Sequence, residues 1–208
     1  KAKPMKVLEG MVEDFVLEWK PAQESHTQLL RDIECGVTVE VFAGEDDQAT
    51  EPDPEILEEG THFHKLLEFL TPDSNQSTKP SMPSEQELMN WLGVDQAHAQ
   101  KVLERVNKVL AAPELSKYLT SGQWIAAWNE LDIASKEGKS YRMDRLVEFD
   151  DHIAILDYKL TIPEAGSEKY EQYREQLQNY RNELSRIRED KPSKAYLVSS
   201  SGELKELS

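Results

Sequence analysis

Cysteine is nearly absent from this sequence. The single residue of this type, Cys35, excludes an internal disulfide framework and any metal or iron–sulfur site built on four cysteines. The sequence also lacks an apolar run near the roughly 20 residues that span a membrane, and its start does not have the pattern of a signal peptide. These absences predict a cytoplasmic protein that has no membrane partner.

Basic residues are few relative to acidic ones. The chain has 24 lysines and arginines against 40 aspartates and glutamates, a formal net charge of −16. This balance has the wrong sign for a module that holds nucleic acid by electrostatics alone.

The length of 208 residues and the hydrophobic content of 38% predict one globular domain, with room for a helical annex. The start at Lys1 rather than methionine favours a domain excised from a longer protein.

The first part of the chain differs in pattern from the rest. Apolar residues at helical spacing predict a helix over residues 5–19, followed by a second helix over 25–34 and a short strand over 36–44. The segment 45–55 is acidic and carries two prolines, as linkers do. We therefore expect residues 1–56 to be an N-terminal helical segment and acidic linker, either the end of a preceding domain or a piece that packs on the core.

Residues 57–208 are expected to form the main domain. A helix is predicted over 58–70, and the stretch 85–121, which opens with a capping-box pattern at Ser84 and Glu87, is helical throughout. The period then changes to that of strands. Three strand-like runs, a long amphipathic helix and two closing strands are predicted over 123–135, 140–149, 152–160, 168–189, 194–200 and 203–207. This order predicts a mixed α/β domain with a helical insert.

Residues 141–160 have the pattern of a β-hairpin that turns at Asp150 and Asp151. A two-residue turn there would place Asp144 opposite Asp157. Directly opposed residues of an antiparallel pair have Cβ atoms roughly 4.5–5.5 Å apart, and like charges at that distance repel each other. Asp157 also continues a row of apolar residues, where an unpaired charge is costly. A divalent cation is the simplest candidate for what lies between the two carboxylates.

Lys159 and Glu130 are candidates for the same site. Lys159 follows Asp157 by two positions, so both side chains project from one face of their strand. Glu130 would lie opposite Asp144 if the loop 136–138 joins the first two strands. A structural ion pair and a role at the site remain alternatives for Glu130.

The histidines differ in where they point. His64, near the start of the helix predicted over 58–70, would bring an imidazole to a metal, whereas His62 points elsewhere along that helix. The remaining histidines have no acidic partner in the pattern and are expected to be surface or packing residues. They are His26, His98 and His152.

Five motifs occur in an order that resembles a known family. GTHFHKLLE at 60–68 resembles a G-x-x-x-H helix, NELD at 129–132 a strand with a glutamate, YRMD at 141–144 a G-x-I-D motif, DYK at 157–159 the central signature, and QLQNY at 176–180 a Q-x-x-x-Y helix. Together they resemble the RecB-type nuclease domains of the PD-(D/E)XK superfamily, typically found at the C-terminus of helicase–nuclease proteins. The resemblance covers about residues 57–200.

The resemblance implies a fold and a set of site residues. The fold is restriction-endonuclease-like, with a mixed central sheet flanked by helices and a helical insert before the catalytic strands. The implied metal ligands are the side chains of His64, Asp144 and Asp157 and the backbone carbonyl of Tyr158. Such an oxygen-rich site with one imidazole suits Mg²⁺ or Mn²⁺. Lys159 would orient or activate water, Glu130 joins the candidate catalytic residues, and Gln176 and Tyr180 would contact DNA or brace the site.

The implied function is a metal-dependent DNA nuclease. It would process single strands, exonuclease-fashion, as a helicase domain or subunit delivers them during DNA recombination and repair. The chain has no Walker A or other helicase motif, so it does not itself couple ATP hydrolysis to DNA movement. Tyr141 stands where glycine is common in the family, which bears on substrate fit, and the cysteines that bind an iron–sulfur cluster in some relatives are absent.

Two alternatives stay open: a catalytically inactive nuclease-like domain for DNA binding or protein docking, and a different metal-dependent hydrolase on the same sheet.

Overall fold

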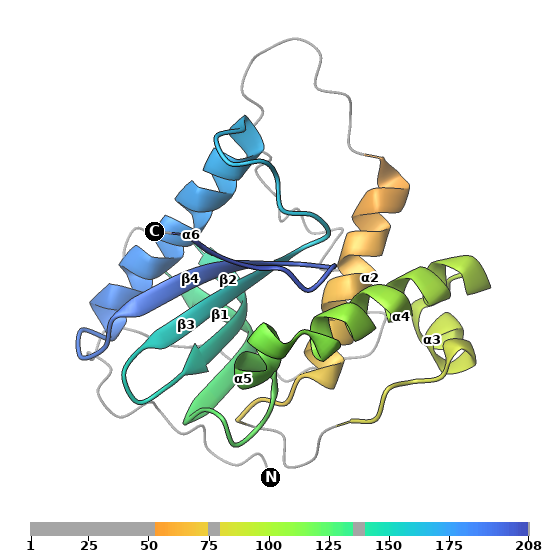
Figure 1. Ribbon diagram of the computed structural model, residues 1–208, viewed down its shortest axis with the longest axis horizontal. Coiled ribbons are helices and arrows are strands. Elements are labelled where there is room, and N and C mark those ends of the chain that lie inside the picture. Colours follow the sequence, from red (N-terminus) through yellow and green to blue (C-terminus); the bar gives the residue numbers. More distant parts are fainter. Residues whose placement is uncertain (1–52, 75–79, 135–139, 208) are drawn as a thin grey trace.

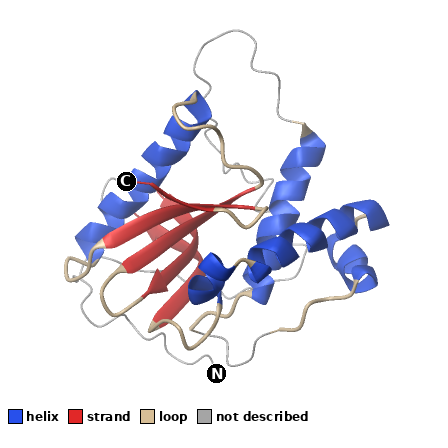
Figure 2. Cartoon of the chain, viewed as in Figure 1, coloured by secondary structure: helices blue, strands red, loops and turns tan. Residues whose placement is uncertain are grey.

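The computed structural model describes residues 53–74, 80–134 and 140–207. The two helices and the strand predicted before residue 45, most of the acidic linker and the loop 136–138 lie outside these ranges. The described residues form a five-stranded mixed sheet with helices on both of its faces (Figure 1 and Figure 2). The mixed α/β class predicted from the sequence is confirmed.

Helices make up most of the described chain before the sheet. Asp53 caps the first of them by accepting a hydrogen bond from the N–H of Glu55 (3.0 Å), so this helix begins ahead of the expected domain start at 57. Ser84 and Glu87 form the predicted capping box. The helical segments are α2 (Pro54–Leu70), α3 (Glu85–Leu92), α4 (Gln96–Ala111), the 3₁₀ turn η1 (Pro113–Leu115), α5 (Ser116–Leu119) and α6 (Glu168–Ile187). Within the described ranges, no helix is both long enough and apolar enough to cross a membrane.

The sheet is a three-stranded meander followed by a crossover. Its strands are β1 (Ala126–Ala134), β2 (Ser140–Glu148), β3 (Ile153–Lys159), β4 (Ser193–Ser199) and β5 (Leu204–Leu207), in the spatial order β1-β2-β3-β4-β5. Neighbouring strands are antiparallel except β3 and β4, which run parallel and are joined through α6. The predicted meander, long helix and closing strands are confirmed.

Apolar cores lie on opposite faces of the sheet. On one face, α2 to α5 pack on the strands through residues such as Phe63 and Leu156. On the other face, α6 packs through residues such as Leu184 against Ile155 of β3 (Figure 1). Because successive residues of β3 enter different cores, this central strand is buried on both faces.

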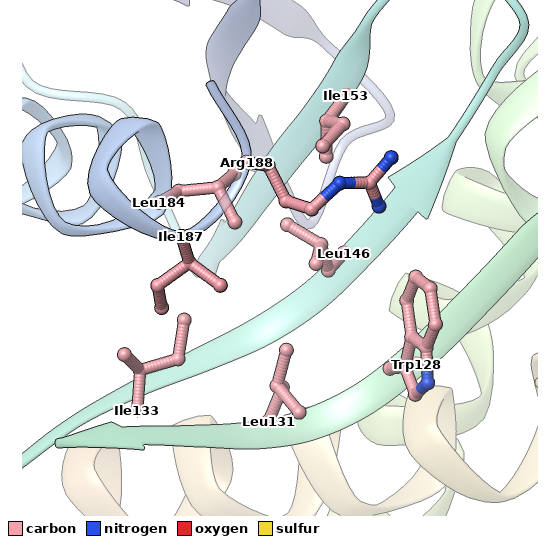
Figure 3. Close-up of a pocket in the computed structure, with 8 residues that line it drawn as sticks. All are labelled: Trp128, Leu131, Ile133, Leu146, Ile153, Leu184, Ile187 and Arg188. Atoms are coloured by element: carbon pink, nitrogen blue, oxygen red, sulfur yellow. The ribbon is translucent and has the colours of Figure 1, made fainter. Parts of the chain in front are cut away.

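The core beneath α6 contains a small cavity of about 20 Å³ (Figure 3). Its lining consists of apolar side chains from β1, β2, β3 and α6, together with the stem of Arg188. A space of this size holds at most about one water molecule, and an apolar lining gives that water no partners. The cavity is therefore a packing gap and not a ligand site.

The β2–β3 hairpin has the register that the sequence predicts. The N–H of Phe149 donates across the two-residue turn at 2.9 Å, and the ladder runs back from there to the pair Arg145 and Leu156. Asp144 and Asp157 occupy the next position in this register, immediately beyond the last ladder pair. The two acids therefore occupy the first position of the hairpin that has no backbone pairing.

Strand β1 changes face at Glu130. Ala127 belongs to the core on the α2 side and Asn129 bonds to the end of α2, whereas Leu131 and Ile133 pack in the core beneath α6. The pairing register with β2 is the same before and after this point, so no residue has been inserted. Glu130 instead has a φ of 47°, the only positive φ of a non-glycine residue in the described ranges. This left-handed conformation rotates the strand, so that Leu131 faces the core beneath α6 although Asn129, two residues earlier, faces α2.

Arg145 anchors the helices to the sheet. Its fully buried side chain donates to the carbonyls of Tyr118 (2.9 Å) and Pro72 (3.0 Å) and to Oδ1 of Asn129 (2.5 Å). Asn129 in turn donates to the carbonyl of Thr71 at 2.8 Å. Since a buried guanidinium is tolerated only when its donors are satisfied, these bonds hold β1, α5 and the end of α2 in fixed positions around β2.

Glu148, the last residue of β2, joins this strand to the segment between α6 and β4. Its carboxylate accepts hydrogen bonds from Arg188 at 3.1 and 2.9 Å and from Lys191 at 2.6 Å. The bonds from Arg188, followed by those from Lys191, lower the pKa of Glu148. The ionised carboxylate therefore stabilises the folded state.

Substitution Glu148→Gln is expected to lower the free energy of unfolding by about 2 kcal/mol at neutral pH, because two cations lose their charged partner. A depressed folded-state pKa contributes stability above the unfolded value, and this contribution disappears as the pH falls through the folded pKa. Urea unfolding at neutral pH and near pH 3 measures both effects, with Glu164→Gln at an exposed position as control. A destabilisation that is equally large at the acidic pH contradicts a role for the charge.

Candidate metal centre

Residues from α2 and three strands meet at the end of the β2–β3 ladder. Ligand atoms of His64 on α2, Glu130 on β1 and Asp144 on β2 lie within 4.8 Å of one another, and in the described ranges no other group of three potential metal-binding side chains meets this closely. Asp157 and Lys159 come from β3 on the other side of Asp144. The structure therefore brings together the residues that the sequence analysis selected from four separate segments.

His64 contacts two of the other expected ligands. Its Nε2 lies 2.8 Å from the carbonyl oxygen of Tyr158, and its Nδ1 lies 3.5 Å from Oδ1 of Asp144. Because a carbonyl only accepts, Nε2 carries the hydrogen in this arrangement. Burial lowers the pKa of His64, but the bond to Asp144 and the charge of Asp144 outweigh it, so the pKa is raised. Ligation of a cation would require the coordinating nitrogen to be unprotonated.

Asp144 is held by the backbone of the neighbouring strand. Its Oδ2 accepts a hydrogen bond of 2.6 Å from the N–H of Tyr158. Burial would raise the pKa of Asp144, but His64, then Lys159 and the Tyr158 N–H, lower it. Asp144 is therefore ionised, and its carboxylate connects β2 to β3 just beyond the last pair of their backbone ladder.

Asp157 is the most deeply buried acid of the site, at 2% exposed. Its Oδ2 lies 2.7 Å from Nζ of Lys159, yet no described residue gives this oxygen a well-aligned hydrogen bond. Burial raises the pKa of Asp157 to about 6, and the charge of Asp144 adds to the effect. For Lys159, burial lowers the pKa but the two acids raise it above its usual value. Asp157 thus pairs with Lys159 and lies outside the group of three that includes Glu130.

Both roles left open for Glu130 have support. Its Oε2 lies 2.8 Å from Nε of Arg142, which is the ion pair, and its carboxylate also lies beside His64 and Asp144. Burial, together with the charges of Asp144 and Glu68, raises the pKa of Glu130 to about 7. The sequence analysis did not select Glu68 or Arg142, although Glu68 lies one helical turn after His64 on the same face of α2.

The acids of the site outnumber its permanent cations. Glu68, Glu130, Asp144 and Asp157 lie near Arg142 and Lys159, and burial raises the pKa values of Glu68, Glu130 and Asp157. Ionisation of all four acids together is therefore unfavourable, and a divalent cation beside them would offset their repulsion. Carboxylate oxygens, one carbonyl and one imidazole form a donor set that fits Mg²⁺ or Mn²⁺. The poorly satisfied buried oxygen of Asp157 is consistent with the same conclusion.

Helix α6 braces β2 beside the acids. Gln176 donates to the hydroxyl of Tyr180 at 2.6 Å, and that hydroxyl donates to the carbonyl of Arg142 at 2.9 Å. Burial raises the pKa of Tyr180 to about 12, so the hydroxyl stays protonated. Tyr141 packs edge-on against Tyr180 with ring centroids 5.9 Å apart. Gln176 and Tyr180 are thus linked to β2 by these two hydrogen bonds, and their role at the site, including a contact with DNA, stays a prediction.

The other described histidines lie away from the centre. His62 points elsewhere, as predicted, and its Nδ1 lies 3.0 Å from Nε2 of His98. His152 is a packing residue, as expected: its ring stacks on that of Phe149 with centroids 4.8 Å apart, and its Nδ1 also lies 2.7 Å from Oδ1 of the adjacent Asp151. A pair of neighbouring residues in a turn has no spacing pattern that would have predicted this contact. His26 lies outside the described ranges.

Comparison with known proteins assigns no family. No model of a known protein family matches the chain. No curated protein matches it either. Among solved structures, the fold is similar to the crystal structure of protein VC1899 from Vibrio cholerae, with a TM-score of 0.32 and 9% sequence identity over 70% of this chain and 43% of that chain. The chain thus spans less than half of the length of VC1899, and the interpretation of the site depends on its own geometry.

The left-handed backbone of Glu130 makes a stability test possible. We expect Glu130→Gly to be about 1 kcal/mol more stable than Glu130→Ala, because glycine adopts a positive φ without strain. Both variants lack the carboxylate, so denaturant unfolding of the pair isolates the backbone effect. The same two substitutions at the neighbouring exposed Asp132, whose φ is not positive, provide the control, and there alanine should be the more stable. Equal stability of the two Glu130 variants contradicts backbone strain at this position.

Proposed function

We propose that residues 57–208 form a metal-dependent DNA nuclease domain that hydrolyses phosphodiester bonds, of the RecB type within the PD-(D/E)XK superfamily. The observation that carries this proposal is the meeting of His64, Asp144, Asp157 and Lys159 where the β2–β3 ladder ends. The five motifs of the resemblance lie on α2, β1, β2, β3 and α6 in that order. The mixed sheet with a preceding helical insert agrees with a restriction-endonuclease-like fold.

The proposed metal ligands are His64, Asp144, Asp157 and the Tyr158 carbonyl, with Glu130 adjoining them. A bound Mg²⁺ or Mn²⁺ supplies Lewis acidity, which lowers the pKa of a coordinated water and offsets negative charge on the scissile phosphate. The chain itself positions these groups. Tyr158 orients Asp144 through its N–H and His64 through its carbonyl, so one residue aligns two ligands.

Lys159 is the cation of the chain that we expect beside the reacting phosphate. Its pairing with Asp157 raises its pKa, which keeps the ammonium charged at neutral pH. A fixed positive charge in a buried site stabilises negative charge that develops in the transition state. Gln176 and Tyr180 contribute indirectly, since they hold the strand that carries Asp144.

The acidic composition is compatible with a helicase as partner. A net charge of −16 opposes unguided binding to DNA. We propose that a helicase domain or subunit supplies the basic channel and delivers single strands to the site, as in exonuclease-type processing during recombination and repair. The acidic surface would then restrict cleavage to strands that arrive through this channel.

A catalytically inactive role is the second candidate. In the structure, His64 bonds to the Tyr158 carbonyl and Asp157 pairs with Lys159, so both side chains already have a partner within the chain. This arrangement is also what a domain for DNA binding or protein docking would need for stability. Calorimetric titration with Mn²⁺ separates the two functions: a nuclease binds the ion, and no binding at millimolar Mn²⁺ supports the docking role.

The variants Asp157→Ala and Lys159→Ala are expected to lose cleavage by at least about 100-fold while remaining folded, because the first removes a proposed metal ligand and the second removes the cation expected beside the reacting phosphate. The assay follows labelled single-stranded DNA with Mg²⁺ or Mn²⁺ against EDTA, and circular dichroism monitors the fold. Asp150→Ala in the hairpin turn and Lys194→Ala on β4 are exposed matched controls that should retain activity. Cleavage at the wild-type rate by either site variant would exclude the proposed mechanism.

A further inference from the structure

The stripe of α6 that packs on the sheet continues past the covered region. Leu177, Tyr180 and Leu184 are buried in the core beneath this helix. One and two turns earlier on the same face, Tyr173 and Tyr170 extend the stripe but remain partly exposed. Both rings pack against the edge of this core and keep part of their surface exposed.

Each of these rings is paired with a lysine from the sheet. Nζ of Lys159 lies 4.7 Å from the ring centroid of Tyr173, and Nζ of Lys205 on β5 lies 4.5 Å from that of Tyr170. Lys159 is the same residue that pairs with Asp157 in the metal centre. The two pairs thus lead from the centre, through Lys159 and Tyr173, to Tyr170 near the start of α6 and Lys205 on β5.

We propose that Tyr170, Tyr173 and Lys205 form the path by which a single nucleic-acid strand reaches the metal centre, with bases stacked on the two tyrosines. Aromatic rings interleaved with cations are the means by which proteins hold single strands without sequence preference. Side chains three residues apart on a helix are about 5–6 Å apart, so neighbouring bases of an extended strand can each meet one ring. The inference depends on the proposed function, because it gives that site its substrate path.

Stacking explains how so acidic a chain binds a strand. Lys159 belongs to the metal centre, where it pairs with Asp157, which leaves Lys205 as the phosphate contact of the outer part of this path. Stacking on aromatic rings supplies affinity that does not depend on net charge. A duplex cannot use the path in this way, since the faces of its bases are already covered by their neighbours. The path is therefore selective for single strands.

Binding is best measured without cleavage, with a fluorescent oligothymidylate in EDTA. We expect Tyr173→Ala and Tyr170→Ala to weaken binding by about five- to hundredfold each, the effect of removing a stacked ring. Tyr173→Phe should retain most of the affinity, because the ring remains. Lys205→Ala should make the plot of log affinity against log salt shallower by about 0.7, the contribution of one phosphate contact to a single strand.

Lys117 provides a matched control. Its Nζ lies 4.7 Å from the ring centroid of Tyr118, the same type of pair at the same distance, but on the opposite face of the sheet. Lys117→Ala should bind the oligonucleotide with wild-type affinity and salt dependence. A duplex of the same sequence should bind more weakly than the single strand to the wild-type chain, and Tyr173→Ala should remove this difference.

The outcomes separate this inference from the proposed function. Wild-type affinity in the two tyrosine-to-alanine variants, absence of binding by the wild-type chain, or equal losses in Lys117→Ala overturn the path. With Mn²⁺ present, Tyr170→Ala should raise KM and leave kcat nearly unchanged; a wild-type KM overturns the path even where the nuclease is active. Binding that depends on the tyrosines without any cleavage supports the path and rejects the nuclease.

Discussion

Repulsion between the carboxylates of Asp144 and Asp157 is the constraint around which the other parts of the centre are arranged. The two acids follow the last backbone pair of β2 and β3, where no ladder bond holds the strands together. Each acid has its own partners instead: the Tyr158 N–H and His64 for Asp144, and Lys159 for Asp157. Because His64 also reaches the Tyr158 carbonyl, the docking of α2 and the separation of the strand ends depend on the same few polar contacts.

Residues of β1 and β2 next to the centre hold this part of the sheet in place. Glu130 takes up a conformation that costs roughly 1–2 kcal/mol for a residue with a Cβ, and in doing so places Asn129 toward the helices and Leu131 toward the other core. Asn129 then completes the set of acceptors around the buried Arg145. The strained Glu130 and the buried Arg145 are each unfavourable alone. They are coupled because Asn129, which bonds to Arg145, directly precedes Glu130 on β1. Such strain is found where a site requires a geometry that a regular strand does not provide.

Periodicity and turn chemistry predicted the elements well, since both are local properties of the chain. The Asp150 and Asp151 turn set the hairpin register, and hence the meeting of Asp144 with Asp157, without any tertiary information. The pairing of Glu130 with Arg142 and the positive φ of Glu130 were not predictable, because they depend on which core each neighbour enters. The orientation of Asp157 toward Lys159 was missed for a related reason: a strand pattern gives the face of a side chain but not its rotamer. The nuclease activity proposed for these ligands is inferred from the resemblance to a family and not from these patterns.

The hydrogen bond between His64 and Tyr158 also bears on how the centre assembles. It joins residues 94 positions apart, whereas the bond from Tyr158 to Asp144 spans only 14. Closing the longer loop costs about 1.7 kcal/mol more chain entropy than closing the shorter one. The hairpin can therefore form as a local unit, but His64 joins it only when the helical layer has folded onto the sheet. A cation that needs all of these groups would bind the native chain alone and would stabilise the whole fold by mass action.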